Sequence, residues 1–187
     1  FSIGLVQLNA DGSAKLNSSG QPLYTYGPAD VTGLARVFTG YNWDTTGHVR
    51  GTNPLRYRNP MVLDATKHST QDASFLGVTV PGSTPGAQAL KTALDTLYNH
   101  ANTGPFIARA LIQRLVTSAP SPAYIARVAA VFANNGAGVR GDLRAVTKPV
   151  LLDPEARAAA GLSTPACGKL REPMIRCVQW ARTFGAT

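Results

Sequence analysis

Residues 104–133 read GPFIARALIQRLVTSAPSPAYIARVAAVFA, and they carry the strongest helix signals of the chain. Apolar residues recur every three or four positions from Ile107 to Leu115, which is the spacing of one helix face. Ser121, with a proline after it, is typical of a helix start, because serine caps the first amides and proline fits the first turn. The second helix has Arg127 as its only charged residue. We therefore expect two helices here, the second being the most buried of the chain.

The same signals recur on both sides of this stretch. Thr84 and Asp142 each precede an apolar stripe and can cap a helix, and residues 170–184 place their apolar side chains, Cys177 included, on one face. Pro149 should kink or shorten the helix that follows Asp142. The sequence thus predicts a mainly α protein, with a helical bundle of five or more helices over residues 83–187.

The first part of the chain, residues 1–82, has a different pattern. Turn residues such as Asp11-Gly12 alternate with short apolar runs, which is typical of small β-hairpins. A short helix should follow Pro28, and residues 41–60 form an irregular loop. We therefore expect small β-hairpin elements near the N-terminus, a short helix and a loop before the bundle.

The composition limits the classes of protein. The chain has 187 residues, of which 44% are hydrophobic and 15% are charged. That hydrophobic fraction is enough for a packed core, and the length is that of a single domain. No apolar run approaches the ~20 residues that a membrane-spanning helix needs. A disordered chain and a charge-rich coiled coil are excluded, and no transmembrane segment is expected.

Positive charge is concentrated in the second half of the chain. Residues 100–187 carry 11 basic and 4 acidic side chains, against 7 and 6 in residues 1–99. Most of the basic residues are Arg, whose planar guanidinium pairs with phosphate and carboxylate, so we expect a basic helical face for an anionic polymer, a phosphate or an anionic membrane surface. The alternative is a solvated surface on which Arg binds carbonyls at helix ends. The candidate anion-binding residues are Arg109, Arg114, Arg140 and Arg144.

Catalytic signals are weak. His68 and Asp72 could form a base and the carboxylate that orients it, with His48 from the loop as a third group. The alternative for this polar segment is a turn that binds its own backbone. A metal site that adds Asp64 lacks any close His pair, so no metal is predicted. There is no Gly-x-Ser-x-Gly elbow and no Walker motif, and the glycine-rich loop over 134–142 is explained by a helix end, so no cofactor is predicted.

The two cysteines are ten residues apart and match no zinc signature. Cys177 falls on the apolar face of the last helix, and we expect it in the core. A disulfide with Cys167 is possible only where the loop at Cys167 folds back onto that helix, because ten residues of continuous helix would separate the two by ~15 Å. The bridged and unbridged states both stay open.

Several segments, in their order, resemble a known family. They are FSIGLVQLNADG at the start, YGPADVTGLARVFTGYNWD, FLGVTVPG, the helical block over 94–157, and GKLREPMIR near the end. Together they resemble a large bacterial family of proteins of unknown function, numbered eighteen hundred, over nearly the whole chain. The sequence departs from that pattern at Ser69, where an acidic residue often follows the histidine matching His68, and at Pro149.

The resemblance has three implications. Family members are longer, so the resemblance implies that residues 1–187 are the C-terminal portion of one larger domain. Many members carry export signals, so an extracytoplasmic location, periplasmic or secreted, is expected. The family has no established reaction, so no catalytic residue is implied.

These observations favour a non-catalytic binding or assembly module, while leaving open whether the protein is an enzyme. The alternative is a hydrolase or a metal-dependent enzyme whose site, with His48, His68 and Asp72, is completed by the N-terminal portion. A portion of a domain exposes surface that the rest once covered. The expected partner is therefore the N-terminal portion of the same protein, or a second copy. The apolar residues expected at that surface are Phe1, Ile3, Leu5 and Phe38.

Overall fold

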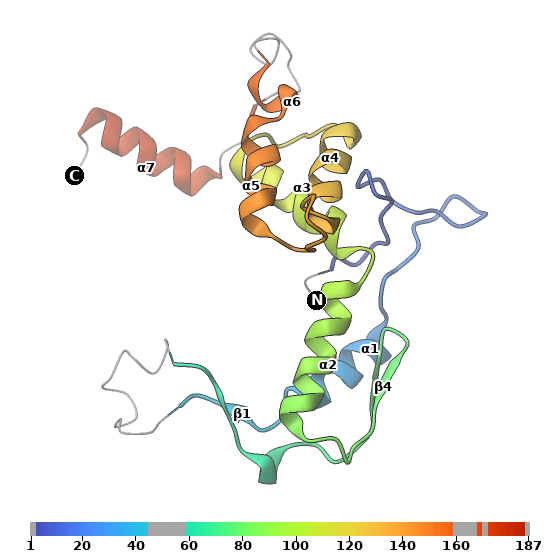
Figure 1. Ribbon diagram of the computed structural model, residues 1–187. Helices are drawn as coiled ribbons and strands as arrows, with labels where there is room; N and C mark the ends of the chain where they lie inside the picture. The colour runs from blue at the N-terminus through green and yellow to red at the C-terminus, as the bar shows by residue number, and fades with distance from the viewer. Residues whose placement is uncertain (1–2, 45–58, 159–167, 170–171, 186–187) are drawn as a thin grey trace. The chain divides into compact units, whose positions relative to one another are not determined.

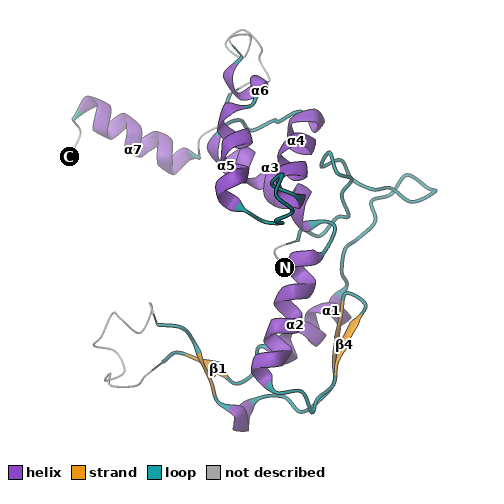
Figure 2. Ribbon diagram, viewed as in Figure 1, coloured by secondary structure: helices purple, strands orange, loops and turns teal. Residues whose placement is uncertain are grey.

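The computed structural model describes residues 3–44, 59–158, 168–169 and 172–185. It contains seven α-helices and two small antiparallel sheets in this part of the chain (Figures 1 and 2). The protein is therefore mainly α, as the sequence predicts. The chain divides into two compact units: unit 1 is Phe1–Val6 with Tyr24–Thr103, and unit 2 is Gln7–Leu23 with Gly104–Thr187.

In its described residues, unit 1 combines two α-helices with two antiparallel strand pairs. Its helices are α1 (Pro28–Val37) and α2 (Gly86–Asn99). β1 (Tyr41–Asn42) pairs with β2 (Val62–Leu63), and β3 (Ala73–Phe75) pairs with β4 (Val78–Val80). These strands lie well inside the chain, so the expectation of hairpins near the N-terminus was too narrow. The alternation of apolar residues in β3 and β4 puts Phe75 and Val80 inside.

The core of unit 1 lies where α1 and α2 meet the β3–β4 hairpin. Leu34 and Val37 of α1 and Ala89 and Ala93 of α2 are buried in it with Phe75. The approach of α1 to β3 requires a residue without a side chain, because a Cβ at Gly33 would lie 1.8 Å from the Ser74 carbonyl oxygen. A second fixed point is Asp30, whose carboxylate accepts from the backbone amides of Gly27 and Leu76, and these bonds lower its pKa.

The N-terminal segment is tied to the end of α2. The Asn102 side chain, itself buried, donates to the backbone carbonyls of Ile3 and Val6 at 2.6 and 2.9 Å. Of the two outcomes expected for Ile3, exposure or cover by another part of the molecule, the structure shows the second: Ile3 is 0% exposed, and the bond from Asn102 holds its backbone inward. Leu5 and Phe38 are exposed, as expected, and Phe1 lies outside the described residues.

Unit 2 begins with a small meander over residues 7–23. Backbone bonds join Lys15 to Gln7 and to Leu23, and Gly12 packs against Ile125 of α4. The helices that follow are α3 (Thr103–Leu115), α4 (Pro122–Ala133), α5 (Leu143–Leu152), α6 (Pro154–Arg157) and α7 (Pro173–Phe184). With α2, the described residues between 84 and 184 contain six helices, so the prediction of five or more is confirmed.

Helix α4 is the centre of the unit 2 core. Five of its twelve residues are buried, and they meet Ala108 and Ile112 of α3 and Val146 and Val150 of α5. Ser121 caps α4 by accepting from the Tyr124 amide, as predicted. The buried residues of α4 are Tyr124, Ile125, Val128, Ala129 and Phe132.

Pro149 does not shorten α5. The helix starts at its predicted cap, Asp142, whose carboxylate accepts from the Ala145 amide, and it continues three residues beyond the proline. Packing explains the continuation, since Val146 and Val150 are fully buried on either side of Pro149. Burial of that stripe compensates the missing backbone donor.

The last helix, α7, differs from the rest. It begins at Pro173 and ends at Phe184, followed by Gly185 in the left-handed conformation, and none of its residues is buried. Cys177 is exposed with a free thiol, so the prediction that it lies in the core was wrong. No described residue covers the face of α7 that carries Cys177. Cys167 lies outside the described residues. None of the described helices combines the length and apolar character needed to cross a bilayer.

Candidate functional site

The histidine that the sequence singles out, His68, sits at the end of a short 3-10 turn in unit 1, Ala65–Lys67. Its Nδ1 lies 2.9 Å from the Thr39 carbonyl oxygen, and the next amide, of Ser69, donates to the Thr39 hydroxyl at 2.7 Å. A carbonyl only accepts, so a neutral His68 carries its proton on Nδ1 and keeps a lone pair on Nε2. Nε2 is the nitrogen that is chemically available.

The ring of His68 lies against the start of α2. A Cβ at Gly86 would come within 3.3 Å of the imidazole and 2.7 Å of the Leu63 side chain, so a larger residue there would displace the Leu63 side chain and press on the ring. Tyr41 closes the same corner, because its hydroxyl donates to the Gly86 carbonyl at 3.2 Å. The half-buried imidazole is thus held by three segments of unit 1, and its orientation is fixed.

Asp72 does not orient His68. Its carboxylate accepts from the Gly82 amide at 2.8 Å, and its carbonyl accepts from Arg36 at 2.6 Å. The polar segment binds backbone, which is the alternative that the sequence left open. His48 lies outside the described residues. In the ranges that the structure describes, no three His, Cys, Asp or Glu side chains gather as metal ligands.

Asp64 caps the turn before His68. It pairs with Lys67 at 2.8 Å and accepts from the Thr66 hydroxyl and amide. The bond with Lys67, then those with Thr66, lower the pKa of Asp64 to about 2. The carboxylate therefore stays ionised at neutral pH and holds the turn in place.

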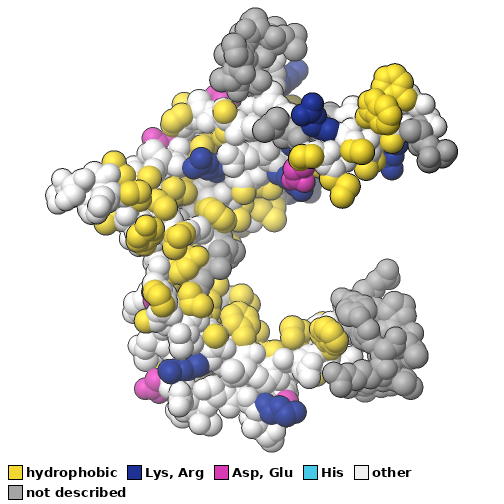
Figure 3. Space-filling model, turned by 180° about the vertical axis from the view of Figure 1, so that it is seen from behind, with side chains coloured by type: hydrophobic (Ala, Val, Ile, Leu, Met, Phe, Trp, Pro, Cys, Tyr) yellow, Lys and Arg dark blue, Asp and Glu magenta, His cyan; other side chains and the backbone are white. Residues whose placement is uncertain are grey.

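The four candidate anion-binding arginines come from three segments of unit 2. Arg109 and Arg114 are exposed on α3, and Arg144 is exposed in the first turn of α5. Arg114 pairs with Glu172 at 2.6 Å, and Arg140 lies 5.2 Å above the Phe132 ring. On the face drawn in Figure 3, basic side chains lie as separate groups with neutral or hydrophobic ones between them.

The glycine-rich loop over 134–142 satisfies its own amides. The Asn134 side chain accepts from the amides of Gly136 and Gly138, and the Asn135 side chain accepts from those of Ala137 and Val139. A phosphate cradle needs such amides free to donate to the ligand. The loop is therefore a structural turn, the interpretation that the sequence favours.

An ion cluster that the sequence analysis did not identify joins α4 to α6. Arg127 binds the buried Asp153 carboxylate through two nitrogens, at 2.7 and 2.8 Å. Glu155 accepts from the amide and hydroxyl of Ser121. The bond with Arg127 lowers the pKa of Asp153 despite its burial. The sequence held one signal for this cluster, Arg127, which is the only charged residue of α4. A charge on an otherwise apolar helix is usually paired with an opposite charge.

Tyr124 completes this cluster. Its hydroxyl donates to the Val150 carbonyl, and burial, followed by the charges of Asp153 and Glu155, raises its pKa to about 12. A phenol with so high a pKa stays protonated, so it acts as a fixed donor. The cluster thus holds α4, α5 and α6 together and has a structural role.

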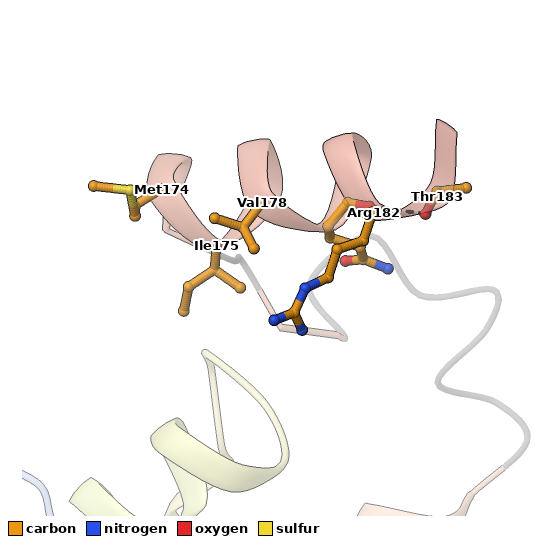
Figure 4. A pocket seen from close by; sticks show the side chains of 6 residues that line it. Met174, Ile175, Val178, Arg182 and Thr183 are labelled. Atoms are coloured by element: carbon orange, nitrogen blue, oxygen red, sulfur yellow. Dashed lines mark hydrogen bonds between the residues drawn. The ribbon is translucent and has the colours of Figure 1, made fainter. Parts of the chain in front are cut away.

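The most accessible apolar surface in the described chain lies on α7. Met174 and Phe184 are 74% and 70% exposed, and Trp180 is 58% exposed. Trp180 and Phe184 contact each other with ring centres 5.7 Å apart. A shallow groove of about 420 Å³ runs along the helix, and Figure 4 shows three of the residues that line it, Ile175, Val178 and Arg182, pointing from the same side of the helix. The groove is lined by apolar side chains, such as Ile175 and Val178, and by the basic side chain of Arg182.

Comparisons with known proteins agree with the resemblance noted from the sequence. No curated protein and no solved structure matches the chain. Residues 1–187 match the family described as "Protein of unknown function (DUF1800)". Because this match covers every residue of the sequence, the chain belongs to the DUF1800 family.

Proposed function

We propose that this protein is a non-catalytic binding or assembly module whose basic C-terminal half contacts an anionic partner. One observation carries the proposal: all four carboxylates of residues 100–187 are engaged by neighbours. Arg127 holds Asp153 and lies 4.0 Å from Glu155, Arg114 holds Glu172, and Asn135 and an amide hold Asp142. The remaining basic side chains outnumber them, and their field attracts anions.

A polyanion tests this proposal. Dextran sulfate serves as the probe, and its affinity for the chain is measured against salt concentration. Arg109→Glu and Arg144→Glu should each weaken binding about threefold to tenfold and flatten the salt dependence. Lys91→Glu is the matched control, because it makes the same charge change at an exposed position of α2 in unit 1. Equal losses for Arg144→Glu and Lys91→Glu would mean that net charge alone acts, without a basic face.

A second candidate function is hydrolysis or metal-dependent catalysis, with the site completed by the N-terminal portion of the longer protein. The fixed ring of His68 favours it, since the bond from Nδ1 to Thr39 leaves Nε2 as a base or ligand. The test is His68→Gln in the longer protein, assayed for ester and phosphate hydrolysis with and without added Zn²⁺. Activity in the parent and its loss in the variant would favour the enzyme.

We further propose the N-terminal portion of the same protein, or a second copy, as a partner of unit 1. The support is the exposure of Leu5 and Phe38, large apolar side chains that a partner would cover. Sedimentation at micromolar concentration tests this, and a monomer of 19.7 kDa with no copurifying fragment would oppose it. An extracytoplasmic location is part of the proposal through the family resemblance, and fractionation of the native cells tests it.

A further inference from the structure

The apolar side chains of α7, apart from Ile175, gather on one side of the helix. At 3.6 residues per turn they span roughly 160° of its circumference, from Trp180 at one edge to Val178 at the other. No residue within this arc is charged, and none is buried. We call it the apolar arc. Its members are Met174, Cys177, Val178, Trp180, Ala181 and Phe184.

A positive charge stands at each edge of the apolar arc. Arg176 precedes Trp180 by four residues and Arg182 follows Val178 by four, so each is the neighbour of an edge residue on the helix surface. No acidic residue lies within Pro173–Phe184. Figure 3 shows the hydrophobic side chains of α7 uncovered on the face that it draws. The helix therefore offers apolar side chains and cations, and no anion.

We propose that α7 binds the surface of an anionic lipid membrane, lying in the plane of the interface with its apolar arc turned toward the acyl chains. Charge complementarity selects this partner. A bilayer supplies an apolar interior next to phosphate groups, which match the arc and its two flanking arginines. A second copy of α7 would instead place four arginines along one contact with no carboxylate to neutralise them.

The aromatic residues and the arginines of α7 contact different parts of the membrane interface. Trp180 and Phe184 contact each other at the C-terminal end of the helix. Tryptophan settles at the level of the headgroups, and phenylalanine is typical of the apolar face of interfacial helices. The stems of Arg176 and Arg182 run beside the arc while their guanidinium groups reach phosphate oxygens. Glu172, the nearest acidic residue, is bound by Arg114 and does not oppose this.

Tryptophan fluorescence gives a local readout. The chain has two tryptophans, Trp43 and Trp180, so Trp43→Phe leaves the one on α7. This variant is titrated with large vesicles of phosphatidylcholine and phosphatidylglycerol, and separately with phosphatidylcholine alone. We expect the emission of Trp180 to shift to the blue with the anionic vesicles, and binding to be at least about tenfold weaker to the neutral ones.

Two neighbouring substitutions separate insertion from charge. Val178→Glu and Gln179→Glu, each made in the Trp43→Phe chain, add the same negative charge, the first in the apolar arc and the second on the polar side. Gln179→Glu should weaken binding to the anionic vesicles about fivefold, from charge alone. Val178→Glu should weaken it about tenfold more, because an apolar contact is lost as well. Both residues are exposed, so neither change should unfold the protein.

Three results would overturn the proposal. They are an absent blue shift, equal effects of Val178→Glu and Gln179→Glu, and a blue shift that depends on protein concentration without vesicles, which would identify a second copy on α7. Arg109→Glu and Arg144→Glu lie outside α7 and serve as a cross-check. The basic-face proposal fails when they leave dextran sulfate binding unchanged, whereas the α7 proposal fails only on the vesicle results.

Discussion

Helices α4 and α7 have the same length and the same kind of start, yet opposite surroundings. Each has twelve residues, begins with proline and carries an apolar stripe. In α4 five residues are buried, and its one charge is neutralised by Asp153. In α7 no residue is buried, and two arginines flank the stripe. An apolar stripe therefore marks a contact surface in both helices, and the charges beside it indicate the chemistry of the partner.

The capping of the two helices differs in the same sense. Ser121 accepts from an amide of α4 and also binds Glu155, so the start of that helix is fixed to α6. Glu172 at the start of α7 caps no amide and pairs instead with Arg114 across an exposed surface. Exposed ion pairs contribute little stability. Helix α7 is therefore held mainly by its own backbone, and α4 by the whole of unit 2.

The largest expected difference comes from one aromatic residue in each helix. Phe132→Ala should lower the free energy of unfolding by about 3–5 kcal/mol, because Phe132 is 4% exposed and fills the core between Gly104 and Arg140. Phe184→Ala should change it by less than about 0.5 kcal/mol, as at other exposed sites. Urea unfolding measures both. Similar losses for the two variants would contradict the contrast between the helices.

A smaller and pH-dependent loss is expected for Asp153→Asn. The folded pKa of Asp153 lies below its ordinary value of 3.8, so its ion pair stabilises the fold above that pH and is lost as the pH falls through the folded pKa. The melting temperature of the variant should therefore be lower than that of the parent between pH 5 and 7, and the gap should narrow below about pH 4. Asp95→Asn, on an exposed helical pair, is the control. A gap that stays constant down to pH 2 would refute the ionic role of Asp153.

The smallest expected effect is at the helix caps. Ser121→Ala should destabilise the protein by about 1–2 kcal/mol, because it removes both the cap of α4 and a donor to Glu155. Glu172→Ala should cost at most about 1 kcal/mol, since it removes only an exposed ion pair. Thermal unfolding of the two variants compares them directly. An equal loss from both would show that α7 is integrated into the fold as firmly as α4.

The local signals in the sequence predicted the helices well. Ser121 and Asp142 cap α4 and α5 as predicted, because an N-cap bond joins residues only three or four positions apart in the sequence. The apolar stripe of α7 was also visible in the sequence. Whether Cys177 on that stripe is buried or exposed was not predictable, because it depends on what packs against the stripe. Periodicity identifies a face and says nothing about its cover.

The candidate site was predicted less well, for a similar reason. A spacing of four residues made His68 and Asp72 a plausible pair, whereas the partner of His68 is the Thr39 carbonyl, 29 residues away. Such a contact is set by the packing of α1 against the strands, which the sequence does not reveal. Arg127 and Asp153 are separated by 26 residues and were missed for the same reason.

Amide hydrogen exchange, measured separately over α4 and α7, distinguishes a buried α4 from an uncovered α7. We expect the amides of α4 to exchange only when unit 2 unfolds, and those of α7 to exchange at least about a hundredfold faster in solution. Anionic vesicles should slow exchange in α7 and leave α4 unchanged. Protection of α7 equal to that of α4 in the absence of vesicles would mean that the apolar arc is already covered, and would rule out the contrast between the two helices.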